Sequence, residues 1–376
     1  MSGPYPHRAL VASGDDIAFM RTALSLGRRG LGNVWPNPAV GCVLVREGRI
    51  VGRGWTQPGG RPHAETEALR RAGDLARGAT AYVTLEPCAH HGVTGPCADA
   101  LIAAGITRAV IALQDPDPRV RGQGLARLRA GAIEVTEGVL GDEAADLNTG
   151  FLLRVSEGRP TFTLKLATSL DGRIAAGNGD SKWITGEPAR RCAHLLRATH
   201  DAALVGAATV LADDPALTCR LPGHARCAPL RLVADSRLRL PAEAQVVRTA
   251  RDLPTWVLTT AAADAVRREA LQAAGVTVIE VAGGSEGVPD ARAMARALAE
   301  RGLTRVMIEG GGRLAASFLR AGLIDRLCWF TAPKIIGGDG IPAVAALGLD
   351  AVRAAPAFRL RQTCRLGTDI FCEYVR

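Results

Sequence analysis

The chain has 376 residues, of which 47% are hydrophobic, and its formal net charge is +9. This length exceeds what one hydrophobic core usually serves, so we expect two domains. Aromatic residues make up only 4% of the chain and the arginines are spread along it, which argues against a stacking surface for nucleic acid. A basic surface of this kind instead favours the capture of small phosphorylated molecules.

Cysteine usage and hydropathy indicate where the protein works. Nine cysteines are scattered through the chain, and no signal peptide is recognisable that would send them to an oxidising compartment. No apolar run reaches the roughly 18 residues that a membrane-spanning helix needs. We therefore expect a cytoplasmic protein without a membrane segment.

The first part of the chain alternates between helical and strand patterns. Helices are predicted over residues 16–28 and from His63 onward. The predicted strands cover residues 39–45, 50–55, 81–85 and 110–113. This alternation indicates a layered α/β sheet.

A break near residue 158 separates two such regions. Residues 141–159 look helical, and Gly158 and Pro160 then interrupt the pattern. We therefore expect domains of residues 1–158 and 159–376. In the second domain, helices are predicted over 187–199 and 291–301, and strands over 162–167, 202–205, 230–234, 255–258, 276–281, 306–308 and 369–374. The second domain is thus also α/β.

Two motifs in the first domain carry metal chemistry: "PHAETEAL" at residues 62–69 and "LEPCAHHGVTGPC" at residues 85–97. One imidazole, His63, and two thiolates, Cys88 and Cys97, make three strong zinc ligands. Three protein ligands leave the fourth tetrahedral position open for water, as in catalytic rather than structural zinc sites. Cys97 is expected to begin a helix, where the helix dipole stabilises a thiolate.

Glu65 is expected to be the proton shuttle of this site. It lies in the first predicted helical turn after His63, so it can reach water at the metal without being a ligand. Buried cysteines are common, and a lone His-x-Glu means little. In this order, however, the two motifs match the signature of zinc deaminases, in which the Glu passes protons to the ring and to the leaving ammonia.

The spacing of the two cysteines narrows the choice among zinc deaminases. Eight residues separate Cys88 from Cys97, whereas cytidine, deoxycytidylate, guanine and transfer-RNA adenosine deaminases commonly have two. With the upstream "PNPAVG" at residues 36–41, this half resembles the deaminase of the bifunctional riboflavin-biosynthesis deaminase-reductase family. The resemblance implies a cytidine-deaminase-like three-layer domain in which Asn37 contacts the substrate. A side-chain amide suits a nucleobase edge because it offers a donor and an acceptor. His90 and His91, inside the insertion, are expected to shape the loop or contact substrate rather than bind metal.

The resemblance continues through the second half, in "TLKLATSLDGRIA", "SKWITG", "LVADSRLRLP" and "MIEGGGRLAASFL". It implies a dihydrofolate-reductase-like domain that uses NADPH. The residues agree in part, since Gly310, Gly312 and Ala315 form a G-x-G-x-x-A turn that can present backbone amides to a pyrophosphate. No acidic residue follows about 20 residues later, so an ordinary Rossmann domain is not expected.

The resemblance also implies the site residues of the reductase. The cofactor-binding set is Ala167, Trp183, Thr209, Asp213, Ser236, Gly311 and Gly312. The substrate-binding set is Lys165, Ser181, Arg197, Leu217, Arg220 and Glu309, with Lys165 and Asp171 near the reacting end.

Several of these residues have ordinary structural alternatives. A guanidinium can bind phosphate in a bidentate fork, so Arg197 and Arg220 are suited to anchor it. Alternatively, Arg197 lies on a solvated helix face, Arg220 lies in a surface loop, and Trp183 belongs to the core. From the residues themselves, Arg237 and Arg239 are candidates to bind the 2′-phosphate of NADPH.

The expected reaction pair is hydrolytic deamination of 2,5-diamino-6-ribosylamino-4(3H)-pyrimidinone 5′-phosphate, followed by NADPH reduction of the ribosyl chain to ribityl. A transfer-RNA-type base editor would share the zinc motifs but would not need the second domain. A non-catalytic binding protein would not need Glu65. The partners expected are thus a small phosphorylated pyrimidine, no nucleic acid and no membrane, with a homo-oligomer formed through the reductase half.

The chain departs from the family pattern in the deaminase loops. The family usually has a basic residue where Val93 stands, Pro where Gly95 stands and Asn where Asp117 stands. We expect Arg119 or Arg121 to compensate by holding the substrate phosphate. The alternative is that Val93 and Asp117 face solvent and that the changes are neutral.

Overall fold

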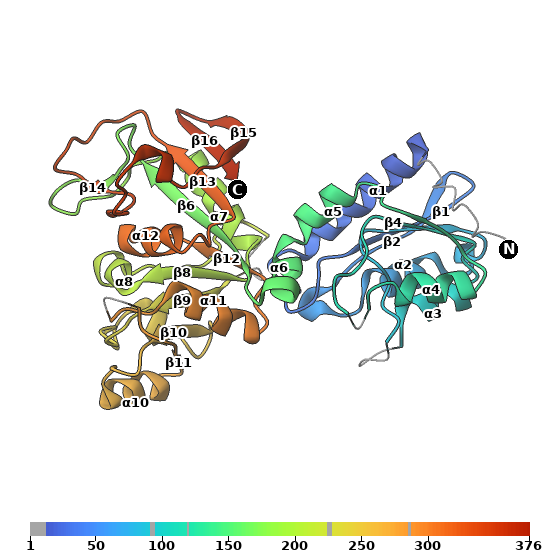
Figure 1. Cartoon of the computed structure of the whole chain (residues 1–376), viewed down its shortest axis with the longest axis horizontal. Helices are drawn as coiled ribbons and strands as arrows, with labels where there is room; N and C mark the ends of the chain where they lie inside the picture. Colours follow the sequence, from blue (N-terminus) through green and yellow to red (C-terminus); the bar gives the residue numbers. More distant parts are fainter. Residues whose placement is uncertain (1–12, 91–94, 119, 224–227, 285–286) are drawn as a thin grey trace. The chain divides into compact units, whose positions relative to one another are not determined.

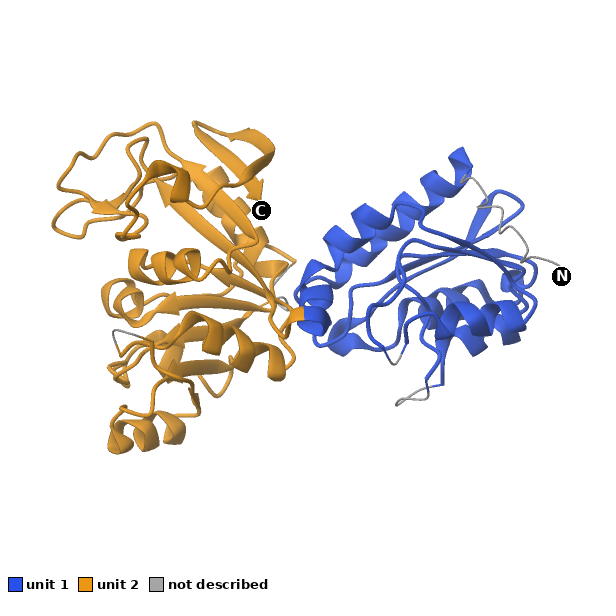
Figure 2. Cartoon of the chain, viewed as in Figure 1, with its two compact units in different colours: residues 1–156 blue, residues 157–376 orange. Residues whose placement is uncertain are grey.

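The computed structural model describes residues 13–90, 95–118, 120–223, 228–284 and 287–376. The chain separates into two compact units, residues 1–156 and 157–376 (Figure 2). No helix in the described ranges is long and apolar enough to cross a membrane.

The first unit is built on a five-stranded sheet with the order β2-β1-β3-β4-β5. β1 pairs antiparallel with β2 and β3, whereas β3, β4 and β5 run parallel. The strands are β1 (Gly41–Arg46), β2 (Arg49–Trp55), β3 (Thr80–Val83), β4 (Arg108–Ile111) and β5 (Glu134–Glu137). The helices are α1 (Gly14–Gly27), α2 (Ala64–Ala72), α3 (Cys97–Ala103), α4 (Gln123–Ala130), α5 (Gly141–Leu147) and α6 (Thr149–Glu157).

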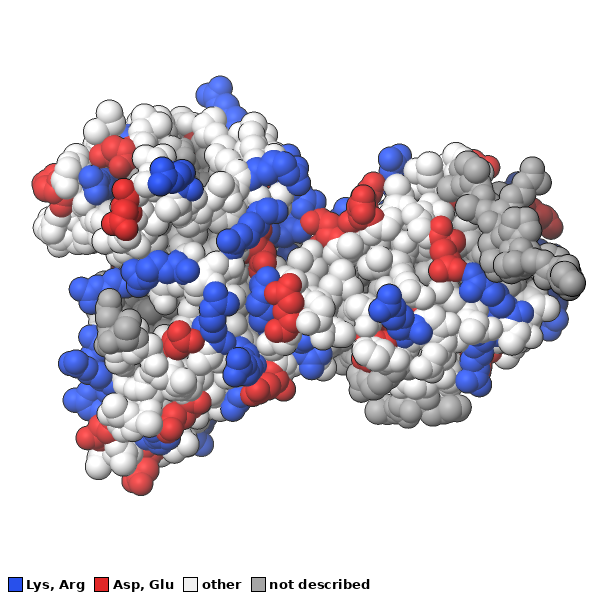
Figure 3. Space-filling model, viewed as in Figure 1, with Lys and Arg blue, Asp and Glu red and all other residues white. Residues whose placement is uncertain are grey.

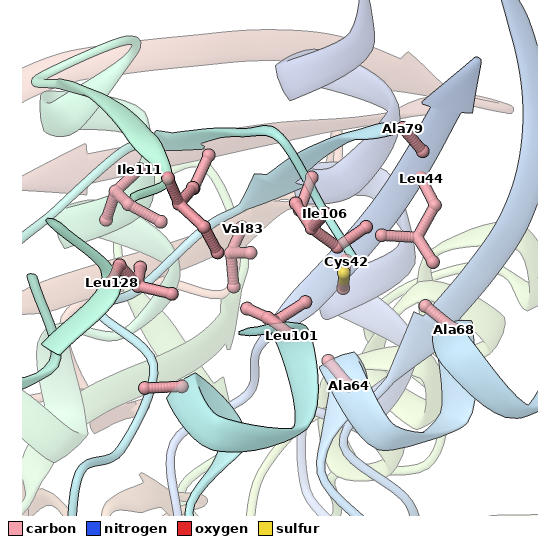
Figure 4. Packing of buried hydrophobic residues seen from close by; sticks show 14 of the residues in the cluster. Cys42, Leu44, Ala64, Ala68, Ala79, Val83, Leu101, Ile106, Ile111 and Leu128 are labelled. Carbon is pink, nitrogen blue, oxygen red and sulfur yellow. The ribbon is translucent and has the colours of Figure 1, made fainter. Parts of the chain in front are cut away.

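Both faces of this sheet are covered, because its strands carry apolar residues on both sides. Cys42 and Leu44 of β1 pack with α2, α3 and α4 on one face (Figure 4). Val43 and Val45, which point the opposite way along the same strand, pack with α1 and α5 (Figure 1). The predicted three-layer α/β architecture is confirmed.

The stretch predicted as one helix over residues 141–159 is two helices, α5 and α6. Asn148 lies between them and is buried. Its side-chain Oδ1 accepts the Ala39 N–H at 2.8 Å and its Nδ2 donates to the Ala39 carbonyl at 3.2 Å. The helix therefore breaks at the residue that holds the "PNPAVG" segment.

The second unit contains a nine-stranded sheet with the order β11-β10-β9-β8-β12-β6-β13-β16-β15. The strands from β11 to β13 are parallel, and β16 and β15 continue the sheet antiparallel. The strands are β6 (Thr161–Thr168), β8 (Ala202–Gly206), β9 (Leu230–Ala234), β10 (Thr255–Thr259), β11 (Thr277–Glu280), β12 (Arg305–Ile308), β13 (Arg326–Thr331), β15 (Arg359–Leu366) and β16 (Asp369–Val375). β7 (Arg173–Ala175) and β14 (Ile341–Pro342) form a separate pair.

Helices connect these strands, and loops and the first turns of helices lie at the carboxyl ends of the parallel strands. The helices are α7 (Glu187–Ala198), α8 (Ala207–Asp213), α9 (Gln245–Arg248), α10 (Ala265–Ala273), α11 (Ala291–Glu300) and α12 (Gly312–Arg320). Because β8, β9 and β12 are parallel neighbours in the sheet, the segments that follow them meet at one carboxyl edge, where ligands bind in open α/β sheets. On the face shown in Figure 3, basic side chains are interspersed with acidic ones in both units.

Candidate active sites

In the first unit, three sulfur and nitrogen donors come together. His63 is the N-cap of α2, Cys88 lies in the loop after β3, and Cys97 is the first residue of α3. The His63 Nδ1 lies 3.3 Å from the Cys97 Sγ and 3.8 Å from the Cys88 Sγ. All three donor atoms lie within 4.8 Å of one another, and the described ranges contain no second cluster of this kind. One imidazole and two thiols at this spacing fit a zinc ion with an open fourth position.

Hydrogen bonds favour the thiolate at Cys88. The Cys97 thiol, the His63 ring and the Cys97 backbone N–H, at 3.3 Å from the sulfur, together lower the pKa of Cys88 to about 4. The same contact with Cys88 raises the pKa of His63. Glu65 lies beside this group in the first turn of α2 and is 3% exposed, and its burial raises the pKa of its carboxyl to about 7.

A pocket opens beside the donor cluster, and Asn37 and Glu65 line it together with His63 and Cys88. The other lining residues are Pro38, Val40, Thr56, Arg61, Leu85, Glu86, His90, Asp115, Asp117, Val120 and Phe151. Gly60 packs against the Asn37 amide so closely that a Cβ there would lie 1.8 Å from the Asn37 Nδ2, and its φ of +83° also favours glycine. The structure thus brings the predicted Asn37, Glu65 and two of the metal donors to one pocket, and the buried Cys97 completes the donor cluster.

Glu86 was not predicted, although it stands in the "LEPC" motif. Its buried carboxylate accepts four backbone N–H groups, those of Asp115, Gly122, Gly124 and Leu125, at 2.9 to 3.3 Å. It thereby joins the strand end that carries Cys88 to the loop that carries Asp117. A carboxylate directly after a buried strand and before a ligand was the signal that could have found it.

Of the three positions that depart from the family pattern, the structure describes Gly95 and Asp117 but not Val93. Asp117 is 8% exposed and lines the pocket, so the alternative that it faces solvent is wrong. Arg121 is exposed and is not among the lining residues, whereas Arg61, which the sequence did not single out, is. Gly95 is exposed. His91, Val93 and Arg119 lie outside the described residues.

In the second unit, the glycine turn after β12 approaches the start of α8. Gly310 and Gly311 have φ values of +116° and +85°, and Gly312 begins α12. A Cβ on Gly311 would lie 3.5 Å from the Thr209 Oγ1. The turn can therefore bring backbone amides and the helix start close to a phosphate group, which fits a dinucleotide cofactor.

Beside this turn, charged side chains form a tight group. The Arg197 guanidinium donates to both Glu309 carboxylate oxygens, at 2.5 and 2.8 Å, and to the Thr218 carbonyl at 2.9 Å. Their side chains are 15% and 5% exposed, so the alternative that Arg197 lies on a solvated helix face is wrong. Burial lowers the pKa of Lys165, while the Glu309 carboxylate opposes that shift.

Trp183 and Arg220 line a surface pocket elsewhere in this unit. Trp183 is 61% exposed and stacks with Arg190, whose guanidinium lies 4.6 Å from the ring centroid, so the prediction that it could belong to the core is wrong. Arg220 is exposed, and its backbone N–H donates to the His194 Nδ1 at 3.4 Å. The pocket is lined by Trp183, Glu187, Arg190, Arg191, His194, Arg220, Leu221 and Pro222.

The other predicted reductase residues are spread over strand ends and loops. Ala167 lies in β6, Asp213 ends α8, Ser236 follows β9, Leu217 is buried in a loop and Ser181 is partly exposed in another. The Asp171 carboxylate accepts the Ser169 hydroxyl and the N–H groups of Ile336 and Gly337, which lower its pKa to about 2. Asp171 therefore organises a loop.

The fold and these two sites define a class: a metal-dependent deaminase of the cytidine-deaminase type joined to a dinucleotide-dependent reductase. Comparisons with known proteins agree. Residues 13–113 match the cytidine and deoxycytidylate deaminase zinc-binding region, and residues 160–372 match the RibD C-terminal domain.

Relatives match over nearly the whole chain. The riboflavin biosynthesis protein RibD of Escherichia coli K12 is 42% identical over 96% of this chain and 99% of its own, and that of Bacillus amyloliquefaciens is 42% identical over 94% of each. A solved RibD structure from Acinetobacter baumannii is 37% identical with a TM-score of 0.86, covering 96% of this chain and 98% of its own. The Thermotoga maritima diaminohydroxyphosphoribosylaminopyrimidine deaminase/5-amino-6-(5-phosphoribosylamino)uracil reductase is 36% identical with a TM-score of 0.83 and the same coverage.

The chain belongs to the RibD family of riboflavin biosynthesis proteins. It is a bifunctional enzyme, with a zinc-dependent deaminase of cytidine-deaminase-like fold and an NADPH-dependent reductase of dihydrofolate-reductase-like fold.

Proposed function

We propose that residues 1–158 deaminate 2,5-diamino-6-ribosylamino-4(3H)-pyrimidinone 5′-phosphate and that residues 159–376 reduce the ribosyl chain of the uracil product to ribityl. The observation that carries the first half is one pocket lined by His63, Cys88, Glu65 and Asn37, with Cys97 in the same donor cluster. The substrate is the one that the name of the Thermotoga maritima relative describes.

In the deaminase, His63, Cys88 and Cys97 would hold zinc, which when bound supplies a Lewis acid that lowers the pKa of a water molecule. Glu65 takes a proton from that water with its carboxylate and passes protons to the ring nitrogen and the departing amine. The Asn37 amide, held against Gly60, donates to and accepts from the edge of the pyrimidine.

In the reductase, NADPH supplies the hydride when it is bound. The turn at Gly311 and Gly312, with Ala167, Trp183, Thr209, Asp213 and Ser236, would hold that cofactor. Lys165 donates a hydrogen bond from its Nζ to the ring-opened sugar where the hydride arrives. The Glu309 carboxylate favours the charged form of Lys165, and Arg197 holds that carboxylate in place. Ser181, Leu217 and the exposed Arg220 would position the rest of the substrate, with Arg220 binding its phosphate.

The decisive experiment is turnover of the diaminopyrimidine phosphate with and without NADPH. Without NADPH, the deaminated uracil compound should accumulate with release of ammonia. With NADPH, the ribityl product should form with stoichiometric oxidation of the cofactor. Release of ammonia from a nucleic-acid substrate, with no NADPH oxidation on the pyrimidine phosphate, would overturn the proposal in favour of a base editor.

We also propose that the protein is cytoplasmic, binds no nucleic acid and assembles as a homo-oligomer through the reductase unit. The edge strand β15 supports the last point, because seven of its eight residues are exposed, Leu360 among them. Light scattering of the full chain and of a Leu360→Lys variant tests it, since an assembly through this edge should weaken in the variant.

A further inference from the structure

The short loop after β9, residues 235–240, is organised by one buried carboxylate. Asp235 is 1% exposed, and its own N–H donates to the Leu258 carbonyl of β10. Its carboxylate accepts the backbone N–H groups of Arg237, Arg239 and Leu240, at 3.4, 2.5 and 3.1 Å. Three amides converging on one buried acceptor give the loop a defined shape.

Side chains in this loop alternate between core and solvent. Leu238 and Leu240 are buried and belong to the apolar cluster beneath β9. Arg237 and Arg239 are exposed. With both leucines fixed in the core, the two arginines are directed outward at the end of the strand.

The two arginines differ in their partners. The Arg239 Nε lies 3.6 Å from the Asp235 carboxylate, which offsets part of its charge. The Arg237 guanidinium makes no ion pair or hydrogen bond with any residue in the described ranges. Arg237 therefore presents a full positive charge and its unused donors to solvent.

This loop lies at the cofactor edge of the sheet. β9 is the parallel neighbour of β8, with Ala234 opposite Gly206, and the N–H of Gly206 lies near the glycine turn. Thr209, Ser236 and Gly311 thus follow three parallel strands that end at the same edge. A dinucleotide whose pyrophosphate lies at the turn can extend one end across β8 toward β9.

We propose that residues 235–240 recognise the 2′-phosphate that distinguishes NADPH from NADH, with Arg237 as the binding cation and Asp235 as the positioning residue. The proposal rests on the assignment of the cofactor to the turn at Gly311. A phosphate dianion matches an unpaired guanidinium in charge and in hydrogen-bond geometry, whereas NADH has only a neutral hydroxyl at that position.

The test is equilibrium binding of NADPH, NADH and 2′,5′-ADP to the full zinc-loaded chain. Arg237→Ala should weaken NADPH and 2′,5′-ADP roughly 10- to 100-fold, the loss expected for hydrogen bonds to a charged group, and leave NADH within about twofold. Arg239→Ala should have a smaller effect, because Asp235 already offsets its charge.

Arg248→Ala is the matched control. Arg248 is an exposed arginine at the end of α9, beside Thr249, which bonds Arg231 near the start of β9. The variant removes the same charge near the opposite edge of the sheet and should leave both affinities unchanged. Equal losses in Arg237→Ala and Arg248→Ala would mean a general field effect and would overturn the proposal. Failure of the unmodified chain to bind either nucleotide would instead overturn the reductase assignment.

Asp235→Asn tests the positioning role, since it keeps the size of the side chain and removes its charge. The amides of Arg237, Arg239 and Leu240 should exchange hydrogen faster, and the ratio of NADPH to NADH affinity should fall while NADH affinity is kept. Equal losses for both nucleotides would show that Asp235 only maintains the fold.

Discussion

The deaminase pocket and the reductase site differ in how their buried charges are balanced. In the deaminase pocket, backbone N–H groups satisfy the Glu86 carboxylate, and the charges that act most strongly on Glu65 are those of His63 and Cys88. In the reductase site, Glu309 is satisfied by Arg197, a side chain 112 residues away. Removing a reacting group from the first site should therefore leave the fold intact, whereas removing a charge from the second leaves its partner buried and unpaired.

The largest expected effect is on deamination by Glu65→Gln. The variant keeps the size of the side chain, and the three metal donors are unchanged, so one zinc per chain should remain bound. Deamination should fall by at least the 10²- to 10⁴-fold that a general acid or base typically contributes. Metal analysis and ammonia release measure the two effects.

The reductase serves as the internal control in this experiment. Its rate on the deaminated substrate should be unchanged in Glu65→Gln, because its site lies in the other unit. Full deaminase activity with bound zinc would eliminate Glu65 as the proton shuttle.

The sequence could predict those parts of the molecule that depend on local pattern. β9 was predicted with its observed limits, and the helix start at Cys97 followed from the order of strand, cysteine and helix. It could not predict that Asn148 divides a helical stretch, because the reason is a contact with Ala39, 109 residues away. For the same reason, the pairing of Arg197 with Glu309 and the presence of Arg61 in the pocket were not predicted, since both depend on tertiary placement.

Arg197→Ala should destabilise the second unit. Breaking a buried ion pair by removing one partner typically costs about 3–5 kcal/mol, and Glu309 would remain buried without its guanidinium. Thermal unfolding of the full chain should show a lower transition for the reductase and an unchanged deaminase rate. A double variant, Arg197→Met with Glu309→Gln, should recover part of the stability because the Glu309 carboxylate is no longer left buried without its guanidinium. Equal stability of the single variant and the unmodified chain would contradict this account.

Arg220→Ala should weaken substrate binding with little effect on the fold, since Arg220 is exposed and its guanidinium is not part of the buried pair. Losing a hydrogen bond to a charged phosphate is worth about 1.5–3 kcal/mol, so the reductase KM should rise roughly 10- to 100-fold while kcat and the KM for NADPH stay nearly constant. Steady-state kinetics with each substrate varied in turn provide the measurement. An unchanged substrate KM would remove Arg220 from the phosphate site.

The smallest expected effect concerns the cation of the deaminase pocket. The pocket is rich in carboxylates, with Glu65, Asp115 and Asp117 among its lining residues, and Arg61 is the arginine that lines it within the described ranges. Arg61 lies two residues before His63 and is partly exposed, so its charge stands in the pocket that would receive the nucleotide.

We therefore expect Arg61, rather than the exposed Arg121, to help hold the phosphate of the deaminase substrate. Arg61 is partly exposed, which limits the contribution to about 1 kcal/mol, or roughly a fivefold rise of the deaminase KM in Arg61→Ala. Arg121→Ala removes the same charge from a residue outside the pocket lining and should change that KM less than twofold. Val93→Arg, which restores the cation usual in the family, should lower the KM and should compensate Arg61→Ala when the two are combined. Zinc content must stay at one per chain in every variant for the comparison to hold. A rise of KM in Arg121→Ala without one in Arg61→Ala would contradict this assignment and would indicate that Arg121, in the loop that contains Asp117, binds the phosphate.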